Sequence, residues 1–420
     1  MHAPSPSNTA PLKIALVAPP MKAVPPVGYG GTERVVDALA TGLVARGHDV
    51  TVFATGDSHV AGRLVPIRDE ALWNEGYRGD IAGFMEMAAD AVWKHADEFD
   101  VIHSHLETFG FLLARYCATP VVTTLHGRLD DSFTPDLLQE FTDIPLVAIS
   151  ENQRRWWPDQ NWVATIHHGQ DLTGSPFRDQ PGDYLAVVGR VAPEKGIAEA
   201  IELARKTGRP LKMAAKALDP AEIAMRDELV TPAHEEGVIE FLGELLPPER
   251  DEMMAGAFAT LMLGTWPEPF GLVAIESLAT GTPVIGRRTG ALPEIIEAGV
   301  DGYLVDDLGE AMLALDRIGD LDRTEIRRRT LERFSVERMT AAYEEVYRDL
   351  VAGPRGVVAS PPARRSVTVP KRTVRRERPV EPALPTIPLP APAAATSSGS
   401  KASPAPATSA ATASPDVRTH

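Results

Sequence analysis

Two glutamates in one short segment carry the strongest chemical signal of the chain. Glu268 and Glu276 stand eight positions apart in TWPEPFGLVAIESLATGTPVIG (265–286), and Phe270 and Gly271 between them open a predicted helix. The acid pair of a glycoside hydrolase has to lie about 5–9.5 Å apart, whereas eight residues of helix rise about 12 Å. The spacing therefore favours two carboxylates that accept hydrogen bonds from different hydroxyls of one elongated ligand. The alternative is a pair of ordinary helix glutamates, one in the first turn and one facing solvent.

A second signal is the loop GRVAPEKG (189–196), which joins a predicted strand to a predicted helix. Arg190 and Lys195 leave this loop five positions apart. A planar guanidinium and an ammonium group beside the free amides of a helix N-terminus suit a diphosphate. The P-loop pattern G-x-x-x-x-G-K-[ST] is absent. The alternative is a surface loop with two unrelated cations.

Glycines near the N-terminus, in GYGGTERVV (28–36), follow the first predicted strand. Gly28 and Gly30 match the first two glycines of the dinucleotide pattern G-x-G-x-x-G, but Glu33 occupies the third position. This mismatch disfavours a hydride-transfer enzyme. Gly30 and Gly31 instead open a helix N-terminus, where unpaired amides bind anions. A flexible connection is the alternative.

These residues lie in a chain that alternates short apolar runs with amphipathic segments. The first half has predicted strands at 12–18, 49–54, 100–104, 120–124 and 145–150, and predicted helices at 32–47, 81–95 and 107–117. The second half has predicted strands at 184–189, 210–215, 238–243, 257–263 and 283–286, and predicted helices at 195–207, 219–230, 248–256, 271–280, 292–298 and twice within 308–333. Such alternation predicts parallel sheets covered on both faces.

Two successive sets of strands and helices predict an α/β protein of two facing Rossmann-like, doubly wound domains. The predicted domains are residues 10–172 and 173–334, with a helix at 335–352 that returns to the first domain. Ligands of doubly wound sheets bind at the carboxyl ends of the strands, so the cleft between the domains is the expected site.

The last residues, 353–420, have a different composition. They hold 13 of the 37 prolines, with 10 Lys and Arg against 3 Asp and Glu, and we expect this Pro/Ala/Ser-rich tail to be disordered. Its basic patch at 364–378 is either a solvated linker or a contact for an anionic membrane or for the acidic body.

Charge and cysteine content limit the class of protein. The chain has a net charge of −16 although its tail is basic, and an acidic body disfavours nucleic acid as a partner. The single cysteine, Cys117, suits a reducing compartment. The first residues do not have the pattern of a signal peptide, and no apolar run reaches the roughly 20 residues of a membrane span. We therefore expect a cytoplasmic protein, with peripheral contact at the inner membrane face if the tail binds lipid.

Several segments together resemble the retaining family-4 glycosyltransferases of the GT-B fold. The similar segments are GYGGTERV, TLHG, GRVAPEKG, PEPFGLVAIE and GTPVIG…TGALPEI…GVDGYLV, in the family's order across about residues 12–350. The chain departs from the family at HHGQDLTGSPF (167–177), where relatives often carry Asn-Gly-Ile-Asp, and at Thr289–Gly290, where a glycine pair is frequent.

The resemblance assigns roles to residues of both domains. It implies that Gly31, next to Gly30, contacts the donor phosphates and that Arg190 and Lys195 bind the diphosphate. It places Glu268 against the hydroxyls of the transferred sugar, with the amides of Phe270, Gly271 and Leu272 beside it, and Glu276 at the ribose. His126 matches the active-site histidine, although without the resemblance a structural, hydrogen-bonded histidine is the simpler interpretation.

The expected reaction is transfer of a sugar from a nucleoside diphosphate sugar, with retention of the anomeric configuration. The resemblance to the family favours a UDP-hexose as this donor. The acceptor is a small molecule, a saccharide or a lipid, and no cofactor or metal is expected. Asp320 and Asp322 form the one D-x-D string, at the start of a predicted helix, which indicates helix capping. The alternatives are a sugar phosphorylase, a nucleotide-sugar epimerase, or a non-catalytic subunit that binds nucleotide sugars.

Two features of the segment around residue 150 have competing interpretations. Ser150 is predicted to cap a helix, with Gln153 returning the hydrogen bond, and the alternative is a role in the acceptor site. Trp156, Trp157 and Trp162 are either an aromatic platform for the acceptor or packed core residues.

Overall fold

The computed structural model of the chain describes residues 10–77, 79–129 and 134–353. The predicted tail beyond residue 353, with its basic patch, lies outside the described residues.

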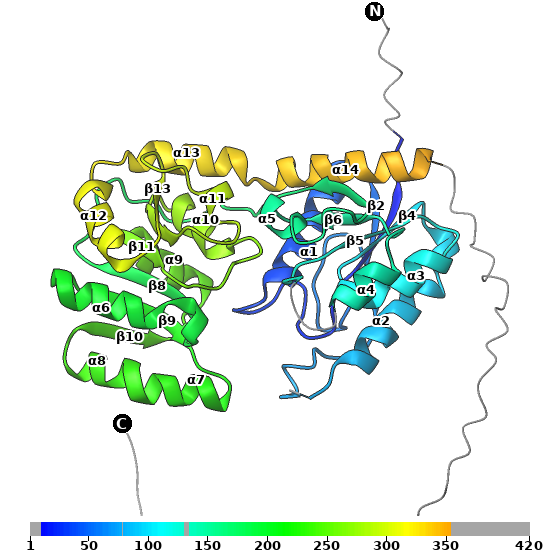
Figure 1. Ribbon diagram of the computed structural model, residues 1–420. Helices are drawn as coiled ribbons and strands as arrows, with labels where there is room; N and C mark the ends of the chain where they lie inside the picture. Colours follow the sequence, from blue (N-terminus) through cyan, green and yellow to red (C-terminus); the bar gives the residue numbers. More distant parts are fainter. Residues whose placement is uncertain (1–9, 78, 130–133, 354–420) are drawn as a thin grey trace, which may run out of the picture. The chain divides into compact units, whose positions relative to one another are not determined.

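The first sheet is formed by strands between residues 13 and 165, and all of its strand pairs are parallel (Figure 1). Its strands are β1 (Lys13–Val17), β2 (Asp49–Ala54), β3 (Arg63–Pro66), β4 (Val101–Ser104), β5 (Val121–Thr124), β6 (Leu146–Ala148) and β7 (Trp162–Thr165). Their spatial order is β3-β2-β1-β4-β5-β6-β7. The helices between them are α1 (Gly31–Ala45), α2 (Ala82–Trp93), α3 (Phe111–Tyr116), α4 (Thr134–Glu140) and α5 (Glu151–Arg154). The order reverses beside β1, as in a doubly wound sheet.

The second sheet has six parallel strands in the order β10-β9-β8-β11-β12-β13. Its strands are β8 (Leu185–Arg190), β9 (Leu211–Lys216), β10 (Ile239–Gly243), β11 (Ala259–Met262), β12 (Val284–Arg287) and β13 (Gly302–Val305). The helices are α6 (Ile197–Thr207), α7 (Pro220–Met225), α8 (Thr231–Glu235), α9 (Pro247–Ala255), α10 (Leu272–Ala279), α11 (Leu292–Ile295), α12 (Leu308–Ile318) and α13 (Arg323–Arg333).

Side chains of alternate strand residues bury on opposite faces of the first sheet. Leu16 packs in one cluster with Val36 of α1 and with Tyr343 of α14 (Val336–Ala352), the last described helix. The next residue, Val17, packs on the other face in a cluster with Met85 of α2. Each such side chain is fully or almost fully buried, which is worth about 1.5–3 kcal/mol for a large aliphatic residue. The apolar runs of the sequence are thus the central strands, covered on both faces.

The fold class predicted from the sequence is confirmed, and some of the predicted elements differ in detail. Strands β3, β7 and β13 and helices α4 and α8 were not predicted, because elements of four to seven residues show little periodicity. Helix α5 was predicted only through its cap, Ser150. The helix expected at 107–117 begins as a 3₁₀ turn (Glu107–Gly110) before α3. The helix expected at 219–230 is α-helical only as far as the end of α7. A π-helical segment (Arg226–Val230) then joins α7 to α8.

Candidate functional site

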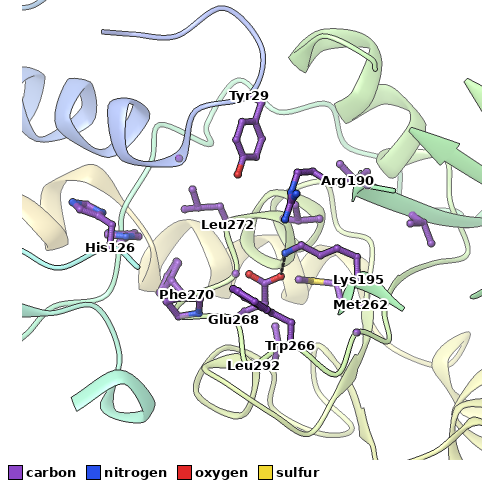
Figure 2. Close-up of a pocket in the computed structure, with 18 of the residues that line it drawn as sticks. Tyr29, His126, Arg190, Lys195, Met262, Trp266, Glu268, Phe270, Leu272 and Leu292 are labelled. Atoms are coloured by element: carbon purple, nitrogen blue, oxygen red, sulfur yellow. Dashed lines mark hydrogen bonds and ion pairs between the residues drawn. The ribbon is translucent and has the colours of Figure 1, made fainter. Parts of the chain in front are cut away.

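Two adjoining cavities lie at the carboxyl ends of strands from both sheets. The larger, about 360 Å³, is lined by residues of both sequence halves, and Figure 2 shows part of its lining. The smaller, about 120 Å³, shares Tyr29, Gly31, Val188, Leu272 and Val273 with it. The larger cavity contains the predicted residues Gly31, His126, Arg190, Lys195, Glu268, Phe270, Gly271 and Leu272. The smaller contains the remaining two, Gly30 and Glu276. The structure therefore brings together all the residues to which the resemblance assigned a role in the site.

Lys195 and Glu268 form an ion pair inside the larger cavity (Figure 2). Lys195 ends the short turn after β8, and Glu268 belongs to the loop between β11 and α10. The backbone of this loop is held by Ala291, whose N–H donates to the Glu268 carbonyl at 2.9 Å. Gly290 makes this contact possible, because its φ is 59° and a Cβ there would lie 2.4 Å from the Glu268 nitrogen. Thr289–Gly290 stands where the family often has a glycine pair. The glycine that the backbone needs is the second of the two positions, Gly290, and it is retained here.

Arg190 ends β8, and two carboxylates engage its guanidinium. Its Nη2 lies 3.0 Å from Glu194 Oε1, and its Nη1 contacts Glu222 Oε1. Neither acid was predicted from the sequence as a partner of Arg190. Glu222 lies on α7, 32 residues away in sequence, so no local pattern indicates the contact. An anion in the cavity has to share or displace these partners.

Two helix N-termini line the same cavity. The N-caps of α1 and α10 are Gly30 and Gly271, and neither helix has a side chain that caps it. The positive ends of both helix dipoles therefore face the cavity that Arg190 and Lys195 also line. Because α10 begins only at Leu272, Glu268 lies outside the helix. The expectation that helical rise separates the two glutamates was therefore wrong, and it is the loop that places them in different cavities.

Glu276 lies on α10, is 5% exposed, and is bound by two arginines. Arg34 Nη1 of α1 and Arg250 Nη1 of α9 lie 3.2 Å from its Oε1 and Oε2, respectively. Burial raises the pKa of Glu276 above its usual value, and the charges of Arg250 and Arg34 oppose this shift. Neither arginine was predicted from the sequence, because both come from other helices and Arg34 is 242 positions from Glu276. Each carboxylate oxygen can still accept a further hydrogen bond.

His126 belongs to a row of histidines at the edge of the first sheet. His105 and His126 follow the paired strands β4 and β5, and His105 Nδ1 lies 2.8 Å from His126 Nε2. His168 stacks on His126 with ring centroids 5.2 Å apart. Desolvation lowers the pKa of His126 to about 3, and burial lowers the pKa values of His105 and His168 well below their usual range. All three are therefore neutral near pH 7, and His126 offers a hydrogen bond rather than a charge.

Three tryptophans were expected either to form an acceptor platform or to pack in the core. Two of them are packed and the third is exposed. Trp162 is buried in β7, and the indole of Trp157 donates to the Leu129 carbonyl at 2.7 Å. Trp156 is 45% exposed. Trp157 and Trp162 therefore serve packing. Asp322 caps α13 by accepting from the amides of Thr324 and Glu325, so the capping predicted for the D-x-D string is confirmed at its second aspartate.

Glu33, in the first turn of α1, is a buried acid whose pKa burial raises to about 7. Its protonated form is favoured in the folded state, so the folded protein loses stability as pH rises from 4.5 through 7. We expect the free energy of unfolding of Glu33→Gln, relative to that of the wild type, to increase by about 3 kcal/mol between pH 4.5 and pH 8. Urea unfolding at both pH values measures the gain, with the exposed Glu337→Gln as the control. An equal effect of Glu33→Gln at both pH values would contradict the assignment.

Within the described ranges no helix is both long and apolar enough to span a lipid bilayer. In the same ranges no three His, Cys, Asp or Glu side chains gather as metal ligands would.

Two doubly wound parallel sheets with a shared ligand cavity define the GT-B fold. The family model described as Glycosyltransferase Family 4 matches residues 29–175, and the model described as Glycosyl transferases group 1 matches residues 174–333. Together these matches cover residues 29–333, which is more than half of the chain, and the chain belongs to the family-4 type of glycosyltransferases.

Relatives and solved structures agree with this family. The D-inositol 3-phosphate glycosyltransferase of Mycolicibacterium smegmatis is 27% identical over 400 residues, covering 80% of this chain and 90% of the relative. The crystal structure of a glycosyltransferase involved in avilamycin A biosynthesis matches with a TM-score of 0.61 and 25% identity, covering 82% of this chain and 99% of that one. An Anabaena protein solved with UDP-glucose has the same fold, with a TM-score of 0.64 and 16% identity over 80% of this chain and 100% of its own.

Proposed function

We propose that the protein transfers a hexose from a nucleoside diphosphate sugar to an acceptor with retention of the anomeric configuration. The observation that carries the proposal is the larger cavity, in which Arg190, Lys195 and two uncapped helix N-termini lie together with Glu268. Cations and helix amides stabilise a diphosphate. An ionised carboxylate accepts hydrogen bonds from sugar hydroxyls.

The difficult step is the departure of the nucleoside diphosphate, on which negative charge develops. Fixed positive groups stabilise this charge more in the transition state than in the ground state, which lowers the barrier. Lys195 is close enough to pair with Glu268, so one ammonium group can lie between the sugar-binding acid and the leaving phosphate. We infer a front-face substitution, in which the leaving phosphate helps to deprotonate the acceptor.

The smaller cavity is proposed to hold the ribose and part of the base. Glu276 projects into it with one arginine on each carboxylate oxygen, an arrangement that orients the carboxylate and favours its ionised form against the effect of burial. Its free lone pairs would accept from the two ribose hydroxyls. UDP-glucose is the first donor to test, because the Anabaena structure of the same fold is a complex with it.

The acceptor is proposed to be a small molecule, a saccharide or a lipid. The inositol phosphate in the name of the M. smegmatis relative makes a phosphorylated polyol the first acceptor to test. His126 lines the cavity from the first sheet and would hydrogen-bond the transferred sugar in its neutral form. The reaction is proposed to occur in the cytoplasm, and contact with the inner membrane face through the tail remains part of this proposal.

No metal or other cofactor is proposed, since two cations and the helix amides already face the leaving group. We therefore expect the initial rate of transfer to be the same in excess EDTA as in the untreated enzyme. A rate that falls on chelation and returns when Mg²⁺ or Mn²⁺ is added would contradict this prediction.

Incubation with a panel of nucleotide sugars and acceptors tests the function. We expect release of nucleoside diphosphate and a product whose anomeric proton, followed by NMR, keeps the configuration of the donor. Sugar phosphate formed from inorganic phosphate would indicate a phosphorylase, and an altered donor sugar without acceptor would indicate an epimerase. Tight donor binding without hydrolysis or transfer would indicate a non-catalytic subunit.

A further inference from the structure

Helix α5, a single turn of the first half of the chain, is fastened to the second half at its N-terminus. The amides of Glu151 and Asn152 donate to the two carboxylate oxygens of Glu294, at 2.8 and 2.7 Å. Glu294 belongs to α11, and His167 Nε2 lies 2.9 Å from its Oε2. Burial would raise the pKa of Glu294, but the hydrogen bonds from His167, Asn152 and Glu151 outweigh it and lower the pKa below its usual value. Glu294 is therefore an ionised acceptor for three donors.

The helix cap Ser150 extends the fastening to the loop that carries Glu268. Its hydroxyl accepts from the Gln153 amide at 3.0 Å, as predicted from the sequence, and donates to the Pro269 carbonyl at 2.7 Å. Pro269 immediately follows Glu268. The 290–294 segment thus holds Glu268 through the Ala291 amide and holds α5 through the Glu294 carboxylate.

The other end of the network reaches His126. The side-chain amide of Gln153 donates to the carbonyls of Leu125 and Gly127, at 2.9 and 2.8 Å, and so holds the backbone on both sides of His126. Its carbonyl accepts from the Ile149 amide at 3.0 Å rather than from the cap residue itself. Gln153 is almost fully buried, and all of its hydrogen-bonding groups have partners.

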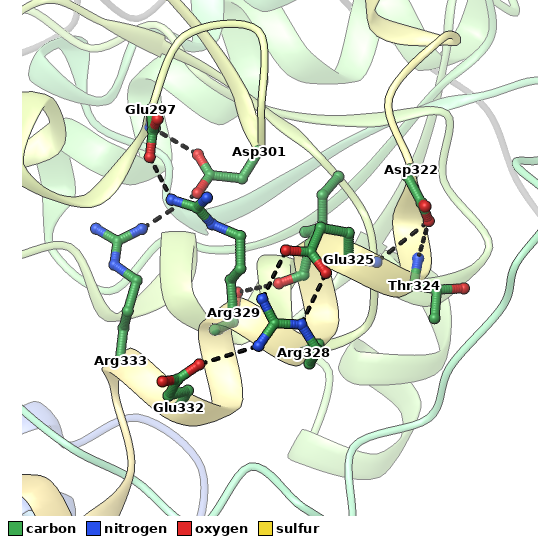
Figure 3. Close-up of polar contacts among 11 residues, drawn as sticks. Glu297, Asp301, Asp322, Thr324, Glu325, Arg328, Arg329, Glu332 and Arg333 are labelled. Carbon is green, nitrogen blue, oxygen red and sulfur yellow. Dashed lines mark hydrogen bonds and ion pairs between the residues drawn. The ribbon is translucent and has the colours of Figure 1, made fainter.

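Glu294 is in turn held by the helix behind it. Arg333 Nη2 donates to the Glu294 carbonyl at 3.0 Å, and its Nη1 lies 3.2 Å from Asp301 Oδ2. Figure 3 shows this part of α13, where the neighbouring Arg329 pairs with Glu297 of the same loop. The segment that fastens α5 is therefore braced from its far side.

We propose that α5 is a joint that fixes His126 of the first half against Glu268 of the second half, with Ser150, Gln153 and Glu294 as positioning residues. The proposal rests on the proposed function, because it assigns these residues to the geometry of the same cavity. An unbroken path of protein hydrogen bonds joins the His126 backbone to the Glu268 loop through Gln153 and Ser150. Group transfer is sensitive to displacements of about 1 Å, which can cost about 100-fold in rate.

The test compares Ser150→Ala, Glu294→Gln and the exposed control Glu151→Gln, together with Ser150→Thr, which keeps the hydroxyl. We expect Ser150→Ala and Glu294→Gln to lower kcat about 10-fold or more, while the Kd for the nucleoside diphosphate changes less than about 3-fold. Ser150→Thr should restore most of the rate, and Glu151→Gln should match the wild type. Thermal unfolding identifies any variant that is not folded under assay conditions. The kcat and Kd values of the folded variants then test the proposal.

A second readout does not depend on turnover. The imidazole NMR signals of His126, identified by their loss in His126→Gln, should shift in Ser150→Ala and Glu294→Gln and stay in place in Glu151→Gln. Unchanged His126 signals and an unchanged kcat in the first two variants would overturn the joint. A wild type that shows neither transfer nor donor hydrolysis would instead overturn the proposed function, and the NMR result would still decide on the joint.

Discussion

Lys195→Ala should lower the rate of transfer about 100-fold or more, on the scale of losing one preorganised donor to a developing anion. Lys195 lines the larger cavity beside Arg190 and the N-terminus of α10, and its ammonium group pairs with Glu268. Removing it takes away a positive charge and also leaves the Glu268 carboxylate to repel the diphosphate. Steady-state kinetics with the best donor of the panel measures the loss.

The matched control is Lys206→Ala. Lys206 lies at the far end of the helix that follows Lys195, is about half exposed, and pairs with Glu202 at 3.1 Å. The charge change is the same as in Lys195→Ala, but we expect the wild-type rate, because exposed ion pairs contribute little. Arg190→Ala should resemble Lys195→Ala. Wild-type rates in both Arg190→Ala and Lys195→Ala would contradict the proposal that these two residues stabilise the leaving diphosphate.

Glu276→Ala should weaken both the fold and nucleotide binding. Arg34 and Arg250 would lose the carboxylate between them and face each other as like charges, both mostly buried, which we expect to cost about 3 kcal/mol of unfolding free energy. Loss of hydrogen bonds from the ribose should raise the Kd for the nucleoside diphosphate about 10- to 100-fold. Urea unfolding and titration calorimetry measure the two effects.

Inorganic pyrophosphate separates these two roles of Glu276. It has no ribose, so its affinity should hold or improve in Glu276→Ala, whereas that of the nucleoside diphosphate falls. The control is Glu252→Gln, whose carboxylate pairs with Arg178 at the surface and should leave both affinities unchanged. An equal loss of pyrophosphate and nucleotide affinity in Glu276→Ala would show that Glu276 shapes the cavity without contacting the ribose.

The sequence predicted the parts of the site that local rules govern. Arg190 and Lys195 stand in one strand-to-helix turn, and Gly31 opens a helix after a strand, so their placement follows from the topology of a parallel sheet. The carboxyl ends of the strands then bring these turns to one cavity.

The sequence did not predict the contacts between distant segments. Arg34, Arg250 and Glu222 bind site residues from other helices, and Glu294 binds α5 from 142 residues away. No periodicity or spacing encodes such pairs, because they depend on how the helices pack. The same limit explains the wrong expectation for Glu268, whose distance from Glu276 is set by a loop braced by Gly290 and Ala291.

Titration calorimetry that compares nucleoside diphosphates with the corresponding nucleosides tests whether the larger cavity binds a diphosphate. We expect at least one nucleoside diphosphate to bind, its nucleoside to bind at least about 10-fold more weakly, and Lys195→Ala to abolish most of this difference. If no nucleoside diphosphate binds, or if diphosphate and nucleoside bind equally well to the wild type, the cavity is not the diphosphate site described above.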